Sequence, residues 1–176
     1  MMQHSQPMKR RSLFKLGLAG AAVLVLAGGG LALWQRGLTA EGQLTLAGRA
    51  VFEALARAIL DGSLPADASA QRAVLDAHLL RVGAAISAFP PAVRGELADL
   101  LGLLASAPGR LAFAGLAKDW PDASVAELQA MLEGWRFSPL ALRQQAYHAL
   151  RELTNATYYA DPQAWAALGY PGPLTV

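Results

Sequence analysis

The stretch LTLAGRAVFEALARAILDGSLP, residues 44–65, decides the fold class. Its large apolar side chains recur at the i, i+1, i+4, i+8 spacing of an amphipathic helix, at Val51, Phe52, Leu55 and Ile59. The run Asp61–Pro65 then stops this helix, because glycine and proline commonly follow a helix C-terminus. The sequence therefore predicts a helix over residues 44–60.

Further helical patterns, separated by short breakers, continue to the end of the sequence. They predict a helix over about 69–88, a third that carries Val93 and Leu104, a short one over 111–116, and one that starts at Trp120–Asp122. Ser138–Pro139 has the form of an N-cap with proline at the first helical position, and predicts a long helix to about Tyr159. Asp161–Pro162 repeats this device before a short helix ended by Gly169. No stretch has the period-two alternation of a strand, so residues 37–176 are predicted to form one all-α domain of six or seven helices.

Composition and charge exclude several classes of site. The chain has no cysteine, which removes disulfides, c-type haem attachment, iron–sulfur ligation and a thiol nucleophile. The three histidines are too few for a self-contained zinc site. Residues 1–36 hold five basic and no acidic side chains, so 37–176 keep ten basic against thirteen acidic residues, a formal charge of −3. A mildly acidic body without a basic stripe is a poor match for nucleic acid.

Residues 1–36 have the layout of an export signal. A cationic segment precedes the uncharged run Leu16–Trp34, which consists of Leu, Val, Ala, Gly and one Trp. Within it Arg10 and Arg11, followed by Phe14 and Lys15, resemble the twin-arginine pattern with Phe and Leu exchanged. The alternative is a pair of stop-transfer charges beside a membrane anchor.

The run Leu16–Trp34 is long enough to remain in a membrane. Its nineteen residues span about 28 Å as a helix, which matches the hydrocarbon thickness. Its glycines weaken it as a permanent helix, and good cleavage sites are lacking, so cleavage and anchoring in the inner membrane both stay open. The basic residues before the run place everything after Trp34 on the outer side, and the predicted location is the periplasm.

No constellation in the body has the form of an active site. Two carboxylate pairs, Glu127 with Glu133 and Asp119 with Asp122, are interpreted as helix caps and solvated surface. His148 is interpreted as a partly buried structural or interface residue, and His78 as a residue at the boundary of the core. Nothing after the leader matches a glycine-rich phosphate loop. An enzyme would need a catalytic role for His148 or Asp161, and the body is predicted to hold no metal or cofactor of its own.

Aromatic residues are concentrated near the end of the chain. Seven of the eleven aromatic residues after the leader lie between Trp135 and Tyr170. Tyr and Trp are enriched at the energetic centres of interfaces, and the prolines after Tyr170 stiffen the chain before it binds. The residues predicted to bind a partner are Trp135, Tyr158, Tyr159, Trp165, Tyr170, Pro171, Gly172 and Pro173. The alternative for Trp135, Tyr158 and Trp165 is that they close the helical core.

The same residues carry a resemblance to a known family. Three motifs are similar to those of small subunits of the gluconate 2-dehydrogenase subunit 3 type. They are Trp135-Arg136-Phe137-Ser138, the pair Tyr158–Tyr159 before Pro162 and Trp165, and the ending Gly169-Tyr170-Pro171-Gly172-Pro173. The resemblance covers the leader and about the last 40 residues, whereas the middle matches only in helical character. These small subunits accompany flavin-dependent GMC oxidoreductases.

The resemblance implies a non-catalytic small subunit. It would bind a large subunit that holds FAD, assist its maturation and supply the twin-arginine export signal for both, often together with a cytochrome c subunit. Its expected partners are therefore the flavoprotein, the twin-arginine translocase and the inner membrane. The alternative from another class is a stand-alone, membrane-anchored periplasmic helical protein that binds a ligand or has a structural role.

Overall fold

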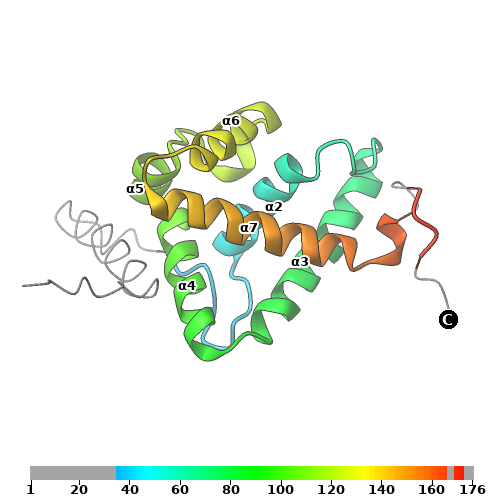
Figure 1. Ribbon diagram of the computed structural model, residues 1–176, viewed down its shortest axis with the longest axis horizontal. Helices are drawn as coiled ribbons and strands as arrows, with labels where there is room; N and C mark the ends of the chain where they lie inside the picture. The colour runs from blue at the N-terminus through cyan, green and yellow to red at the C-terminus, as the bar shows by residue number, and fades with distance from the viewer. Residues whose placement is uncertain (1–34, 166–168, 173–176) are drawn as a thin grey trace, which may run out of the picture.

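Helix α2 (Leu46–Ile59) is the central element of a helical bundle, which a computed structural model describes for residues 35–165 and 169–172 (Figure 1). Val51, Phe52 and Leu55 on this helix are fully buried, as their spacing predicts. Four other helices, α3, α4, α6 and α7, all contact α2. The helix predicted from residues 44–60 is therefore confirmed, and it is the element around which the others assemble.

The described residues form six α-helices and, apart from one isolated antiparallel bridge between Leu38 and Leu44, no β-structure. The predicted all-α fold is confirmed. The helices after α2 are α3 (Ala68–Ser87), α4 (Pro91–Ala105), the one-turn α5 (Ala107–Gly109), α6 (Val125–Arg136) and α7 (Ala141–Tyr159). A π-helical segment spans Arg110–Ala114, and 3₁₀ turns span Trp120–Asp122 and Pro162–Ala164.

Side-chain caps fix several helix starts. The side chains of Thr45 and Asp67 accept the N–H groups of Gly48 and Ala70, which satisfies donors that a helix leaves free in its first turn. Ser124 and Glu127 form a reciprocal capping box at the start of α6.

The predicted cap at Ser138–Pro139 is wrong. Helix α7 begins at Ala141, and Leu140 is its cap residue without a side-chain bond. The Ser138 hydroxyl instead accepts a hydrogen bond from the N–H of Leu140 at 3.2 Å. The backbone carbonyl of Ser138 accepts one from the side-chain amide of Gln144 at 2.8 Å. These bonds build a short turn between α6 and α7, so the serine shapes the connection rather than the helix.

One close approach depends on two glycines. A Cβ at Gly48 would lie 2.0 Å from the carbonyl oxygen of Gly37, and a Cβ at Gly37 would lie 2.3 Å from the Cβ of Leu101. The segment that precedes α2 is therefore held between α2 and α4 at backbone contact distance. Any side chain at either position would push this segment out of the bundle.

The core consists of two clusters. The main cluster surrounds α2 and includes Leu101, Leu128 and Trp135, each at most 1% exposed. A smaller cluster at the far end of α2 joins Leu60, Leu75 and Tyr158. Among the described residues no single helix is long and apolar enough to span a membrane. Within the described ranges, one bent pair, Pro91–Ala105 and Ala107–Ala114, which meet at 84°, has sufficient length and composition.

The interpretation of His78 as a boundary residue is wrong. Its side chain is fully buried on α3, and its ring lies edge-on to the Tyr158 ring at 5.9 Å. Within residues 35–165 and 169–172, neither ring nitrogen has a hydrogen-bond partner. Burial, followed by the charge of Arg81, lowers the pKa of His78 to about 4, so the ring is neutral at pH 7.

Candidate functional site

The chain after α7 folds back on itself around Trp165. The Trp165 indole N–H donates to the Tyr159 carbonyl at 2.8 Å, and the Tyr170 ring lies edge-on to the Trp165 ring at 5.4 Å. Gly172 has a φ of 100°, and a Cβ there would lie 3.3 Å from the Trp165 ring. The turn therefore keeps one face of Trp165 against the backbone and supports Tyr170.

Trp165, Tyr170 and Pro171 form one surface, here called the tail patch, to which Tyr159 contributes its carbonyl oxygen. The Tyr159 ring packs against Tyr158, and its hydroxyl lies 3.2 Å from that of Ser63. Tyr170 is 49% exposed and Pro171 is exposed, whereas Tyr159 and Trp165 are half-buried. These residues lie at or just after the C-terminal end of α7 (Figure 1). That they bind a partner stays a prediction. Pro173 and the export-signal residues Arg10, Arg11, Phe14 and Lys15 lie outside the described residues.

Two residues predicted to bind a partner do not lie on this surface. Trp135 is 1% exposed, packs against Phe113 at 5.4 Å between ring centroids, and donates its indole N–H to Ala114. It belongs to the main cluster, near the other end of α7. Tyr158 is 5% exposed and donates its hydroxyl to the Ser63 carbonyl at 2.8 Å. The predicted contact role is corrected for both residues, because each closes a part of the core.

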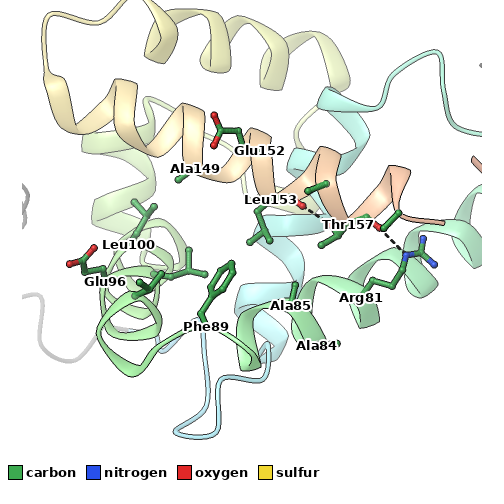
Figure 2. Close-up of a pocket in the computed structure, with 14 residues that line it drawn as sticks. Arg81, Ala84, Ala85, Phe89, Glu96, Leu100, Ala149, Glu152, Leu153 and Thr157 are labelled. Carbon is green, nitrogen blue, oxygen red and sulfur yellow. Dashed lines mark hydrogen bonds between the residues drawn. The ribbon is translucent and has the colours of Figure 1, made fainter. Parts of the chain in front are cut away.

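A second surface feature is a groove of about 790 Å³ between α3, α4 and α7, here called the α7 groove (Figure 2). Phe89 and Leu153 point into it from opposite sides, and Leu100 forms part of its wall. Alanines line the α3 and α7 sides, at Ala84, Ala85, Ala149, Ala156 and Ala160. Val93, an apolar residue of α4 in this wall, is 44% exposed. The groove is therefore an open apolar surface rather than an enclosed cavity.

The charges around the groove differ between its two ends. Glu96 on α4 and Glu152 on α7 lie toward the end that holds Leu100 (Figure 2). Arg81 lies at the other end, where its guanidinium contacts Asp161 at 2.8 Å and donates to the Thr157 carbonyl at 3.0 Å. Among the described residues no cation contacts Glu96 or Glu152. One end is thus anionic, and the charge at the other end is paired.

The candidate catalytic residues occupy ordinary structural positions. Glu127 caps α6 and contacts Lys118 at 2.9 Å, and these bonds, first of all the one from the Ser124 N–H, hold the pKa of Glu127 at about 2. Asp119 pairs with Arg110. His148 is exposed and lies edge-on to Tyr147, so its interpretation as partly buried is wrong. In the part of the chain that the structure describes, no group of three His, Asp or Glu side chains could hold a metal ion.

The α7 groove was not predicted from the sequence. A signal was present in the alanines of residues 149–160, which repeat at helical spacing beside Leu153 and widen the apolar side of α7. Small side chains at these positions of α7 bury little surface against a neighbouring helix. They leave a groove where α3 and α4 diverge from each other. The spacing alone did not reveal this divergence, because it depends on how α3 and α4 meet at Phe89.

Comparison with protein-family models finds no match, and comparisons with the curated proteins and with the solved structures find none either.

Proposed function

We propose that this chain is a non-catalytic small subunit that binds a FAD-dependent dehydrogenase of the GMC type, assists its maturation and directs its export by the twin-arginine route. The observation that supports this proposal best is the tail patch. It is built by the residues that resemble the gluconate 2-dehydrogenase subunit 3 family, and its Tyr170 is 49% exposed.

The contacts of the tail patch suit a binding role. The indole of Trp165 is already bonded to the Tyr159 carbonyl, and the Tyr170 ring rests against it. Side chains that are fixed before binding lose less entropy when a partner covers them. Exposed Tyr next to half-buried Trp is also the combination found at interface hot spots. In this proposal FAD belongs to the large subunit, and this chain contacts the protein around it.

The leader completes the proposed role. Arg10, Arg11 and the apolar run Leu16–Trp34 would carry the folded complex to the twin-arginine translocase and then to the periplasmic face of the inner membrane. The route transports folded proteins, which fits a small subunit that binds a flavoprotein already loaded with its cofactor. A cytochrome c subunit would be a further member of the complex.

The test is purification of the tagged full chain from its own host, followed by an absorption spectrum. We expect a stoichiometric flavoprotein with the flavin bands. Trp165→Ala and Tyr170→Ala should each reduce its recovery, by roughly tenfold or more for a hot-spot residue. Leu111→Ala is the control, since Leu111 is a large apolar residue that is 62% exposed and lies outside both the tail patch and the stretches that resemble the family. A colourless, stable monomer would contradict the proposal.

A stand-alone periplasmic ligand-binding protein is the second candidate, and the α7 groove favours it. Its volume of about 790 Å³ falls within the range of small-molecule sites, and its lining is almost entirely apolar. This candidate predicts that an apolar small molecule co-purifies with the monomer and that the tail patch variants have no effect on its binding.

A further inference from the structure

The α7 groove leaves apolar side chains of three helices uncovered. Val93 is 44% exposed, and Phe89, Leu97 and Leu153 are half-buried. A contiguous apolar surface of this kind on a small domain usually marks a contact with another molecule. The hydrogen bonds, the shape and the charges of the groove each restrict what that molecule is.

The polar side chains that line the groove, apart from Glu96 and Glu152, are already bonded. The Thr157 hydroxyl donates to the Leu153 carbonyl at 2.7 Å, and the Arg81 guanidinium donates to the Thr157 carbonyl at 3.0 Å. An extended peptide would lose water from its backbone N–H and C=O groups in this groove and gain few partners for them. A helix bonds its own backbone groups and presents only side chains. The lining therefore favours a helix over an extended segment.

The shape of the groove also suits a helix. Its α7 wall runs from Ala149 to Ala160, which is about 16 Å or three helical turns. Alanines line both the α3 side and the α7 side, and such small side chains let another helix approach closely. The groove is open, so it covers one face of its occupant, whereas small-molecule sites enclose most of the ligand surface.

The charges specify what one end of this helix carries. Glu96 on α4 and Glu152 on α7 both lie toward the Leu100 end (Figure 2). Among the described residues no cation forms an ion pair with either carboxylate. At the other end Arg81 is already paired with Asp161 at 2.8 Å. A lysine or arginine of the occupant is therefore favoured at the Leu100 end, whereas a carboxylate or an anionic lipid headgroup is repelled there.

We propose that the α7 groove binds an amphipathic helix of a partner chain, which packs its apolar face between α3, α4 and α7 and places a lysine or arginine beside Glu96 and Glu152. About 11 residues of this helix fill the groove, with apolar anchors at i, i+3 or i+4, and i+7. The groove ends at Ala160, just before the turn Pro162–Ala164 that leads to Trp165, so one partner can contact both the groove and the tail patch. The further assignment of this helix to the large subunit rests on the proposed function.

Photocross-linking in the native host tests the occupant. A photoactivatable diazirine amino acid is placed in the full chain at Ala149 or at Ala160, two exposed alanines at opposite ends of the α7 wall. The matched control position is Ala130, an exposed alanine on α6 that does not line the groove. Intact cells are illuminated, and the cross-linked residues are mapped by mass spectrometry.

We expect both groove positions to cross-link to one segment of a different chain, at residues about 11 positions apart. An extended segment would give a spacing of about five, because each of its residues advances about 3.3 Å. The segment should have helical apolar spacing, with a lysine or arginine near the residue cross-linked from Ala149, and Ala130 should not cross-link to it. The extended spacing, a product with the mass of two copies of this chain, adducts with lipid alone, or no adduct would each overturn the proposal.

A charge swap tests the contact at the Leu100 end. Glu96→Lys combined with Glu152→Lys should lower the yield of the cross-link from Ala160 by roughly 3- to 10-fold, because two attractions become repulsions. Replacing the mapped lysine or arginine of the partner by glutamate should restore the yield. Asp99→Lys is the control, since Asp99 is an exposed carboxylate on α4 that does not line the groove. An unchanged yield in the double variant would overturn the proposal.

Helix binding and the proposed function can fail separately. The first is judged by the mapped segment, and the second by the flavoprotein that co-purifies. A mapped helix in a protein without flavin would refute the proposed function and support helix binding. A flavoprotein that co-purifies without a cross-link from the groove would refute helix binding alone.

Discussion

Trp135 and Trp165 make similar contacts in two regions of this molecule but differ in how deeply they are buried. Both donate the indole N–H to a backbone carbonyl, at 3.3 and 2.8 Å, and both pack edge-on or tilted against another aromatic ring at 5.4 Å. Trp135 is nevertheless 1% exposed, whereas Trp165 remains half-buried. Hydrogen bonding and ring packing therefore do not distinguish a core residue from a surface residue; the number of elements that surround it does.

The region around Trp135 and the region around Tyr158 also differ in whether a buried ring nitrogen has a hydrogen-bond partner. Around Trp135 the main cluster is apolar, and its indole is satisfied. At the opposite end of α2, the small cluster around Tyr158 borders His78, whose ring nitrogens have no partner among the described residues. A buried polar group without a partner costs free energy, so the second region should be the weaker part of the fold.

The largest effect is expected at Trp135. Trp135→Ala removes a fully enclosed side chain and should lower the free energy of unfolding by about 3–5 kcal/mol. Trp165→Ala should cost about 1–2 kcal/mol, because that side chain is only partly buried and fewer elements enclose it than enclose Trp135. Urea denaturation of the two variants measures both values. Equal losses would mean that the tail patch belongs to the folding core.

The second effect is the pH dependence due to His78. Its pKa is about 4 in the folded chain and 6.5 in the reference state, mainly because of burial and also because of Arg81. Between these values the unfolded chain binds a proton that the folded chain does not, so stability falls as the pH falls from 6.5 toward 4. The total loss is about 3 kcal/mol.

His78→Phe tests this contribution, since it keeps a ring next to Tyr158 and removes the titration. The variant should lose less stability than the parent chain between pH 7 and pH 4.5 in urea titrations. Above pH 6.5 the two proteins should differ by a constant amount. An unchanged slope in the variant would show that His78 is not the group responsible.

The smallest effects come from one substitution made at two glycines that differ in how closely they are packed. Gly48→Ala places a Cβ 2.0 Å from the Gly37 carbonyl and should destabilise the chain by about 1–3 kcal/mol, as overpacking does. Gly83→Ala on α3 meets only the side-chain oxygen of Gln43, at 3.4 Å. It should be neutral or stabilise the chain by up to about 1 kcal/mol through helix propensity. Thermal denaturation gives the sign, and a stabilising Gly48→Ala would contradict the tight packing around α2.

The spacing of apolar residues was sufficient to predict the helices, because helix formation depends on residues three and four positions apart. Val51, Phe52 and Leu55 could be placed in the core, and Asp61–Pro65 could be placed after the helix, without any knowledge of the other elements. The cap at Ser138 could not be predicted correctly, because its hydroxyl had several local N–H groups within reach and bonds that of Leu140.

The tail patch was predictable in part. Proximity in sequence brings Tyr159, Trp165 and Tyr170 together, since one short turn joins them. The role of Tyr158 was not predictable in the same way, because its neighbour Ser63 is 95 residues away along the chain. The burial of Trp135 likewise depends on Phe113 and Ala114 in the π-helical segment.

The sequence by itself determined that this protein is all-α, where its helices lie, and that its charge and aromatic residues are unevenly distributed. The tertiary structure alone decided that Trp135, Tyr158 and His78 are buried, that His148 and Val93 are exposed, and that α3, α4 and α7 leave a groove between them. The physical reason is the separation of the interacting residues along the sequence. Helix periodicity depends on residues a few positions apart, whereas burial depends on elements that are far apart in sequence and meet at one place in space.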